Sequence, residues 1–154
     1  MNVVCRMGVT AALGVALLAA TLGSASAQDK SLKQQIVGTW RLAATDDPAG
    51  AGAQGIAMFD GSGNFALQIA GAKTAAGNAA YYGTYSVNDA DRSLTFHVDL
   101  SSVAAWNRSD QKEKIVSVTA DELKWTGPMP SGTTGSLTWR HALSATLFNT
   151  RGVR

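Results

Sequence analysis

The residues in this sequence that are best suited to chemistry are a histidine and an aspartate two positions apart, His97 and Asp99. They lie in residues 93–100, where large apolar side chains alternate with polar ones, so both would project from the same face of a strand. A neighbouring carboxylate orients an imidazole ring and raises its pKa toward a value that suits acid–base catalysis. Proton transfer by His97 is therefore one hypothesis, and a pair of merely exposed polar neighbours is the other.

Other side chains offer less. Tyr82 and Tyr85 are alternative proton donors in the preceding predicted strand. A metal site built from His97, Asp99 and His141 would need distant strands to converge, and we expect none. The sequence also lacks the nucleophile elbow of a serine hydrolase and a glycine loop that would bind phosphate. We therefore expect no cofactor, and we favour a binding protein over an enzyme.

A second group of candidate residues follows strand 93–100, where Trp106 lies in a loop-like stretch. A large aromatic side chain in such a loop either caps the mouth of a barrel or lies exposed. Its neighbours Asn107, Arg108 and Gln111 are polar groups that could orient the headgroup of a ligand. Together with His97 they form the predicted ligand-binding set, and a solvated loop is the alternative interpretation.

The elements that must position these residues are short strands. Turn residues recur at intervals of roughly eight to twelve residues after Gln54, a spacing typical of all-β sandwiches and barrels. Eight strands are predicted, over residues 37–45, 55–59, 65–69, 81–87, 93–100, 112–119, 123–126 and 136–143. Eight antiparallel strands can close into an up-and-down barrel that has no free edge and holds side chains or one small ligand. We predict this all-β fold, with a short helical lead-in over residues 31–37.

Alternation predicts which side chains face the barrel interior. Leu94, Phe96, Val98 and Leu100 share the apolar face of their strand, which leaves His97 and Asp99 outside. The other predicted inward residues are Phe65, Leu67, Ile69, Leu123, Trp125, Leu137, Trp139, His141 and Leu143.

The first strand carries the residues expected to close the barrel. Gly38 gives the backbone room where the chain bends into the barrel, and Trp40 is expected to plug the closed end beneath the lumen.

Several runs of residues, taken in order, resemble one family. They are VGTWRL at 37–42, YGTYSV at 82–87, His97–Val98 leading to Trp106 and Gln111, and ADELK at 120–124. Together they resemble the bacterial lipocalin-like domain family, over nearly the whole mature chain. The resemblance implies a small barrel with a cavity and no common reaction. The opening is also similar to that of true lipocalins, in which a late arginine packs over the tryptophan, a role for which Arg140 is the candidate.

The first 27 residues have the pattern of a signal peptide. A charged start with Arg6 precedes an almost wholly apolar stretch over residues 7–22, and small residues at 24–27 form an A-x-A-like cleavage site. We predict cleavage after Ala27 and a barrel domain over residues 28–154. This predicts a periplasmic or secreted protein without integral membrane association after cleavage. The mature chain would contain no cysteine, because Cys5 precedes the cut.

The charge balance excludes some partners. Without Arg6 the thirteen basic residues become twelve, against eleven acidic residues. The sequence has no basic stripe with interleaved aromatic residues, so we expect no nucleic-acid partner. The expected partner is a small apolar or amphipathic ligand, and the sequence does not determine the oligomeric state.

Three functions remain open at this stage. The favoured one is an exported lipocalin-like barrel that binds a small apolar or amphipathic molecule in its lumen. The second is an isomerase or cyclase that acts on such a ligand with His97 as acid or base. The third is a filled barrel that serves as a structural or interaction domain. A lumen packed by Trp40, Trp125 and Trp139 would favour the third.

Overall fold

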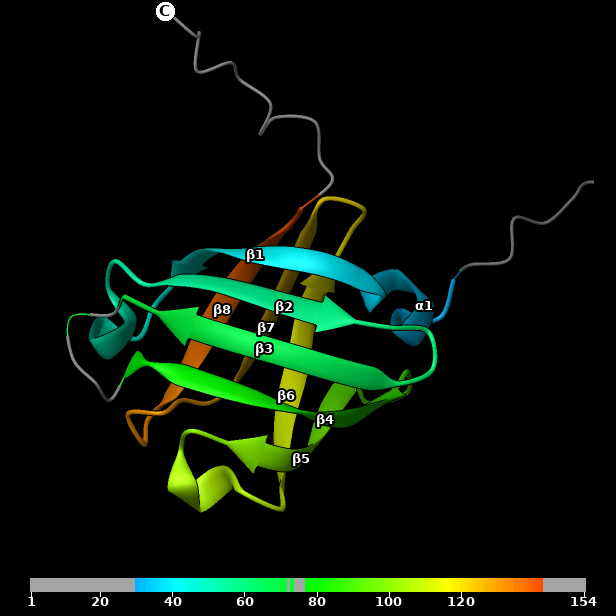
Figure 1. The fold of residues 1–154 in the computed structure, drawn as a ribbon. Helices are drawn as coiled ribbons and strands as arrows, with labels where there is room; N and C mark the ends of the chain where they lie inside the picture. The colour runs from blue at the N-terminus through cyan, green and yellow to red at the C-terminus, as the bar shows by residue number, and fades with distance from the viewer. Residues whose placement is uncertain (1–29, 72, 74–76, 143–154) are drawn as a thin grey trace, which may run out of the picture.

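Eight strands pair in chain order and close on themselves, as Figure 1 shows. The computed structural model describes residues 30–71, 73 and 77–142, so the predicted signal peptide and its cleavage site lie outside the described residues. The strands are β1 (Gly38–Thr45), β2 (Gln54–Phe59), β3 (Asn64–Ala70), β4 (Ala79–Asn88), β5 (Ser93–Ser101), β6 (Ser109–Val118), β7 (Glu122–Pro128) and β8 (Thr134–His141). Each pairs antiparallel with the next, and β8 pairs with β1. The predicted eight-stranded antiparallel barrel is confirmed.

Tight turns join the strands where the sequence places small polar residues. Between β2 and β3 the Asp60 carboxylate accepts hydrogen bonds from the backbone N–H groups of Gly63 and Asn64, both at 2.8 Å. Gly63 has a φ of 99°, a conformation that glycine adopts without steric cost. This turn fixes the register in which Phe59 lies opposite Phe65.

A short helix, α1 (Leu32–Ile36), covers one end of the barrel. Ser31 caps it, and its buried side chains Leu32 and Ile36 join the core. Trp40 follows on β1, is wholly buried, and donates a hydrogen bond from Nε1 to the Ile36 carbonyl oxygen at 2.8 Å. The tryptophan thereby ties the helix to the first strand.

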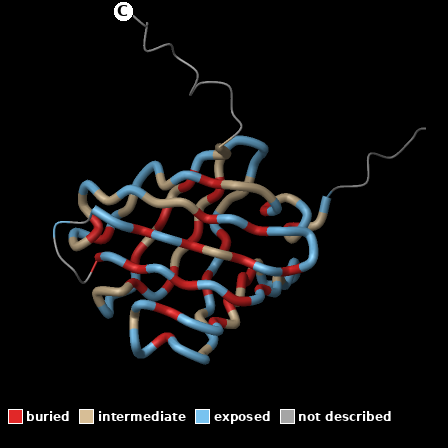
Figure 2. Tube along the Cα trace, viewed as in Figure 1, coloured by how far each residue is buried: buried red, intermediate tan, exposed pale blue. Residues whose placement is uncertain are grey.

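Aromatic rings fill much of the barrel interior. Buried and exposed residues alternate along the strands in Figure 2, as the period-two pattern predicts. Trp125 and Trp139 stack at a centroid distance of 5.1 Å, and Phe96 lies 6.0 Å from Trp125. These three rings and Trp40 are each at most 1% exposed. They belong to one hydrophobic core cluster to which all eight strands contribute.

One predicted inward residue, Leu100, points outward, and a β-bulge is the reason. Gly83 of β4 lies opposite Val98, but Tyr82 lies opposite Leu100, so Asp99 is an extra residue on β5. The extra residue shifts the alternation, which leaves Leu100 54% exposed. The prediction for Leu100 was wrong because alternation assumes an unbroken ladder. Leu143, another predicted inward residue, lies outside the described residues.

The described ranges also contain short 3-10 helices. The 3-10 helix η1 (Pro48–Gly50) follows β1, and η3 (Ala104–Trp106) lies between β5 and β6. None of the helices in the described ranges is long and apolar enough to cross a membrane.

Candidate functional site

The most unusual polar group in the described residues is the carboxyl group of Glu113, which was not among the predicted site residues. Glu113 lies on β6, and its side chain points inward and is only 3% exposed. Its Oε2 atom is buried without a hydrogen-bond partner among the described residues. Burial raises the pKa of Glu113 to about 8, so the group is a neutral carboxylic acid near pH 7. A neutral carboxyl group can both donate and accept a hydrogen bond.

Gly127 and Tyr81 are two of the residues that surround the Glu113 carboxyl group. A Cβ atom at Gly127, on the neighbouring strand β7, would overlap the Glu113 carboxyl group, so only glycine leaves room for it there. Tyr81 of β4 is also buried, and its pKa is raised well above the ordinary value, first by burial and then by the Glu113 charge. The site thus combines one carboxyl group and one phenol, and Trp139 Nε1 is a second buried polar atom without a partner among the described residues.

Trp106 packs against Tyr81 in the barrel interior. It ends η3, is 9% exposed, and its ring lies edge-on to Tyr81 at 5.2 Å. Asn107 holds the loop by accepting a hydrogen bond from the Ser101 N–H at 2.6 Å, and Ser109 donates one to the Trp106 carbonyl oxygen at 2.8 Å. A chain leaving the barrel at Ser101 is therefore turned back so that Trp106 faces inward.

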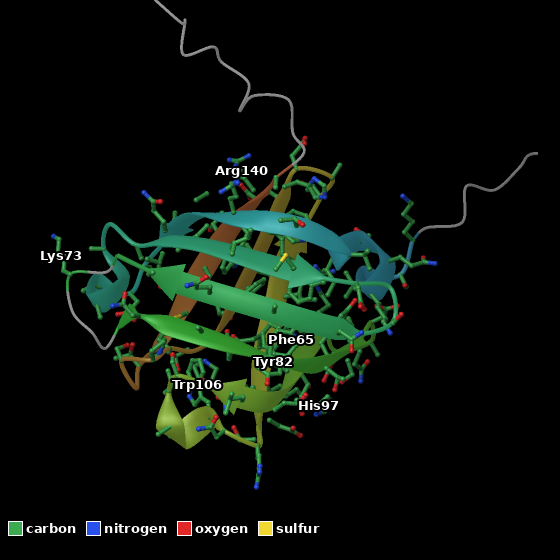
Figure 3. The ribbon with its side chains drawn as sticks, in the orientation of Figure 1. Phe65, Lys73, Tyr82, His97, Trp106 and Arg140 are labelled. Atoms are coloured by element: carbon green, nitrogen blue, oxygen red, sulfur yellow. The ribbon has the colours of Figure 1, made fainter. Side chains whose placement is uncertain are left out.

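The predicted ligand-binding set does not form one site. His97 and Trp106 lie apart in Figure 3, because His97 projects from the outer face of β5 whereas the Trp106 ring packs on interior Tyr81. Arg108 is exposed. Gln111 belongs to β6, which begins at Ser109, and its amide donates to Ser109 Oγ at 2.8 Å.

His97 contacts Asp110 and not Asp99. Its Nδ1 atom lies 2.8 Å from Asp110 Oδ1, and its Nε2 atom lies 3.2 Å from Ser86 Oγ. The order of these contacts is that of a serine-hydrolase triad. The row lies on an exposed sheet face, with the His97 side chain 44% and that of Asp110 66% exposed. Ser86 sits within the β4–β5 ladder, with no pair of free N–H groups described beside it that would bind an oxyanion. The row therefore lacks the enclosed site and the oxyanion-binding groups that acyl transfer needs.

The two candidate tyrosines lie on opposite faces of β4. Tyr82 points outward and is 51% exposed. Tyr85 points inward, and its hydroxyl donates a hydrogen bond to the Asp60 carbonyl oxygen at 2.7 Å. Burial, with a smaller effect from the Asp60 charge, raises the pKa of Tyr85. The hydroxyl proton of Tyr85 is thus engaged in a hydrogen bond to the turn between β2 and β3 and is not available to a ligand.

The closure residues are placed as follows. Trp40 is buried at the α1 end of the barrel, and a Cβ atom at Gly38 would lie 2.7 Å from the His141 ring, which packs edge-on against Trp40 at 4.8 Å. Arg140 points outward, where its Nη2 atom pairs with Glu122 Oε2 at 3.0 Å (Figure 3). The ring that covers Trp40 is therefore His141, because alternation along β8 turns Arg140 to the outer face.

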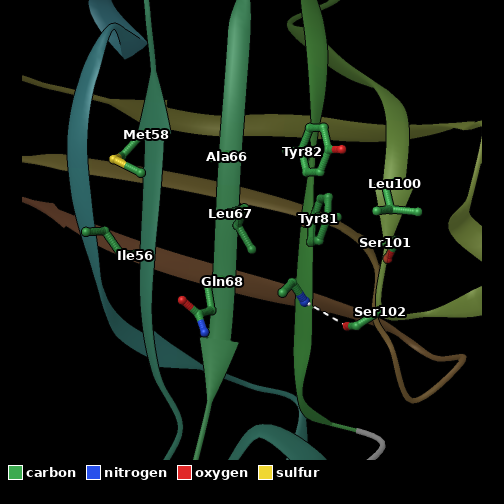
Figure 4. Close-up of a pocket in the computed structure, with 11 residues that line it drawn as sticks. Ile56, Met58, Ala66, Leu67, Gln68, Tyr81, Tyr82, Leu100, Ser101 and Ser102 are labelled. Atoms are coloured by element: carbon green, nitrogen blue, oxygen red, sulfur yellow. Dashed lines mark hydrogen bonds between the residues drawn. The ribbon is translucent and has the colours of Figure 1, made fainter.

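A trough lies on the outer surface of the barrel, over β2 to β5. It has a volume of about 520 Å³. Figure 4 shows Ile56 and Met58 along one side and Tyr82 and Leu100 along the other, with Ala66 between them. Its walls are almost entirely apolar, which is uncommon for the outer face of a barrel strand.

No group of three or more His, Cys, Asp or Glu side chains within residues 30–71, 73 and 77–142 could hold a metal ion. A scan of the sequence against protein-family models and a search of curated proteins both find no match.

The sequence did contain a signal for Glu113. Lys112 and Lys114 flank it and Ile115 follows two positions later, so strict alternation places Glu113 on the same face as a buried isoleucine. Its lack of a partner could not be predicted in this way, because that depends on the side chains of other strands.

Proposed function

We propose that this protein binds a small, largely apolar molecule inside the barrel and that Glu113 forms a hydrogen bond with the polar group of that molecule. The observation that carries the proposal is the buried Oε2 atom of Glu113 without a hydrogen-bond partner. A buried polar atom left unpaired costs about 1 to 3 kcal/mol, so a barrel that serves only stability gains nothing from it.

Electrostatics narrows the class of ligand. With its pKa raised to about 8 by burial, Glu113 is neutral at pH 7 and can donate to a carbonyl, ether or hydroxyl oxygen. An anionic ligand would gain nothing from this low-dielectric interior unless a cation accompanied it. We therefore propose an uncharged amphipathic molecule whose apolar part lies against Tyr81, on whose phenol the Glu113 charge acts, and against Trp106, which packs on Tyr81.

The wider setting of the proposal comes from the sequence. The leader pattern of residues 1–27 and the resemblance to the bacterial lipocalin-like family both support an exported carrier or sensor of a small molecule. In this proposal the protein acts in the periplasm or outside the cell.

A filled barrel with an interaction role is the second candidate. It is favoured by the wholly buried rings of Trp40 and Trp139 and by Trp125 at 1% exposure, which occupy part of the barrel interior. Under this alternative no small molecule occupies the lumen, and Glu113 has no ligand.

The deciding experiment compares the parent with Glu113→Leu. Native mass spectrometry of the protein from its own host first identifies a bound molecule, and fluorescence titration with apolar dyes and fatty alcohols measures affinity. We expect Glu113→Leu to bind at least about tenfold more weakly, the loss of one hydrogen bond of about 1.4 kcal/mol, while unfolding at a higher denaturant concentration.

The matched control is Glu122→Gln, which neutralises a partly exposed carboxylate that pairs with Arg140 on the outer face. It should leave binding unchanged. If no probe saturates the parent protein and no molecule is found with it, the filled barrel is the correct reading and the ligand proposal fails.

A further inference from the structure

A row of apolar side chains crosses four neighbouring strands on the outside of the barrel. Met58 lies opposite Ala66, Ala66 opposite Tyr82, and Tyr82 opposite Leu100, in continuous register from β2 to β5. Met58, Tyr82 and Leu100 are 45%, 51% and 54% exposed. This outer row contains three of the large exposed apolar residues in the described ranges, and it forms the walls and floor of the trough in Figure 4.

The β-bulge builds part of the outer row. Without the extra residue Asp99, the alternation of β5 would place Leu100 in the interior. The bulge also brings the β5 backbone so close to β4 that a Cβ atom at Gly83 would overlap the His97 carbonyl oxygen. The bulge thus turns Leu100 toward solvent, and Gly83 permits the close approach of the two strands at the bulge. Bulges commonly redirect side chains in this way at functional surfaces.

Three of the four strands beneath the outer row carry no charge, and the fourth, β5, carries His97 and the exposed Asp99. β2, β3 and β4 contain no Asp, Glu, Lys, Arg or His residue, whereas β1 and each of β5 to β8 contain at least one. Neutral polar side chains such as Gln54, Gln68 and Thr84 surround the apolar centre. An apolar centre with aromatic and Met side chains, depleted of charge and surrounded by a polar rim, is the composition of a protein–protein interface.

We infer that this face associates with the same face of a second copy of the chain, about a two-fold axis. A two-fold contact places each residue near its own counterpart, so charged residues in it would oppose like charges. The β6 face, with Lys112 and Lys114, would suffer this repulsion. The part of the face formed by β2, β3 and β4 avoids it, so we place the axis over these strands and not over β5, which carries Asp99.

Sedimentation velocity of the purified protein over a range of concentrations tests the inference. The parent should show a monomer–dimer equilibrium. Tyr82→Lys should raise the dissociation constant at least about thirtyfold, the effect of losing a central interface residue worth about 2 kcal/mol. Val116→Lys is the matched control, since Val116 is a 49% exposed apolar residue on β6, away from this face, and it should dimerise like the parent.

Two results would overturn the inference: a parent that stays monomeric at every concentration, or a Tyr82→Lys variant that dimerises as the parent does. A monomeric parent that binds an apolar dye, and loses the dye in Tyr82→Lys, would make the occupant a small molecule instead. Far-UV circular dichroism shows that each variant is folded, and Met58→Lys replaces Tyr82→Lys if the latter is not. Glu113→Leu should dimerise normally, so this inference and the interior ligand can fail separately.

Discussion

At the scale of single residues, Glu113 makes stability depend on pH. The carboxyl group has a pKa of about 8 in the folded chain and an ordinary value of 4.5. Between these values the folded chain keeps a proton that the unfolded chain has released, so stability falls as pH rises, by up to about 1.4 kcal/mol per pH unit. Glu113→Gln should remove this dependence, measured as urea midpoints from pH 5 to pH 9.

The other carboxylates with altered pKa values do not obscure this window. Hydrogen bonds hold the pKa of Asp46, Asp60 and Asp91 below the ordinary value, so their contributions change only in acid. An equally steep loss of stability in Glu113→Gln between pH 5 and pH 8 would show that another group is responsible.

The Ser86–His97–Asp110 row leads to a different expectation. We predict that His97→Ala leaves ligand binding unchanged and lowers stability by at most about 1 kcal/mol, because exposed ion pairs contribute little. Probe titration and denaturation measure both quantities. A rate of ligand conversion in the parent that falls a hundredfold in His97→Ala would instead identify an enzyme.

At the scale of elements, Trp40 joins α1 to the barrel through its buried ring and its hydrogen bond to Ile36. Trp40→Ala should lower the free energy of unfolding by about 3 to 5 kcal/mol, a large part of the stability of a small domain. Chemical denaturation measures the change. Val37→Ala, at a 38% exposed neighbour, is the control and should differ little from the parent.

The bulge on β5 gives a second prediction at this scale. Gly83→Ala should cost about 1 to 3 kcal/mol, because the added Cβ atom meets the His97 carbonyl oxygen. Gly61→Ala is the control, since nothing lies within 4 Å of a Cβ atom there. A Gly83→Ala variant as stable as the Gly61→Ala variant would mean that the two strands separate without cost.

At the scale of the whole molecule, closure of the barrel leaves no free strand edge among the described strands, so association must use a face. The face proposed for the dimer contains no charged residue on β2, β3 or β4. The dimer dissociation constant should therefore change less than about threefold from low to high ionic strength, measured by sedimentation. A dimer that dissociates as salt is added would place the contact on the charged strands.

The sequence alone was sufficient for the strands, their order and the burial of Trp40, because period-two alternation and turn residues are local properties of the chain. It also placed His97 on the outer face, and the structure agrees. The same local pattern contained the inward position of Glu113, which alternates with Lys112 and Lys114 and shares a face with Ile115.

Only the tertiary structure determined which side chains contact one another across the strands. Asp110 and Ser86 reach His97 from β6 and β4, and the register between strands determines which carboxylate is near. The bulge that exposes Leu100 arises from a shift in the pairing of β4 with β5. The isolation of Glu113 Oε2 depends on what every other strand places inside the barrel. Such contacts join residues far apart in the chain, and a local pattern carries no information about register or about distant partners.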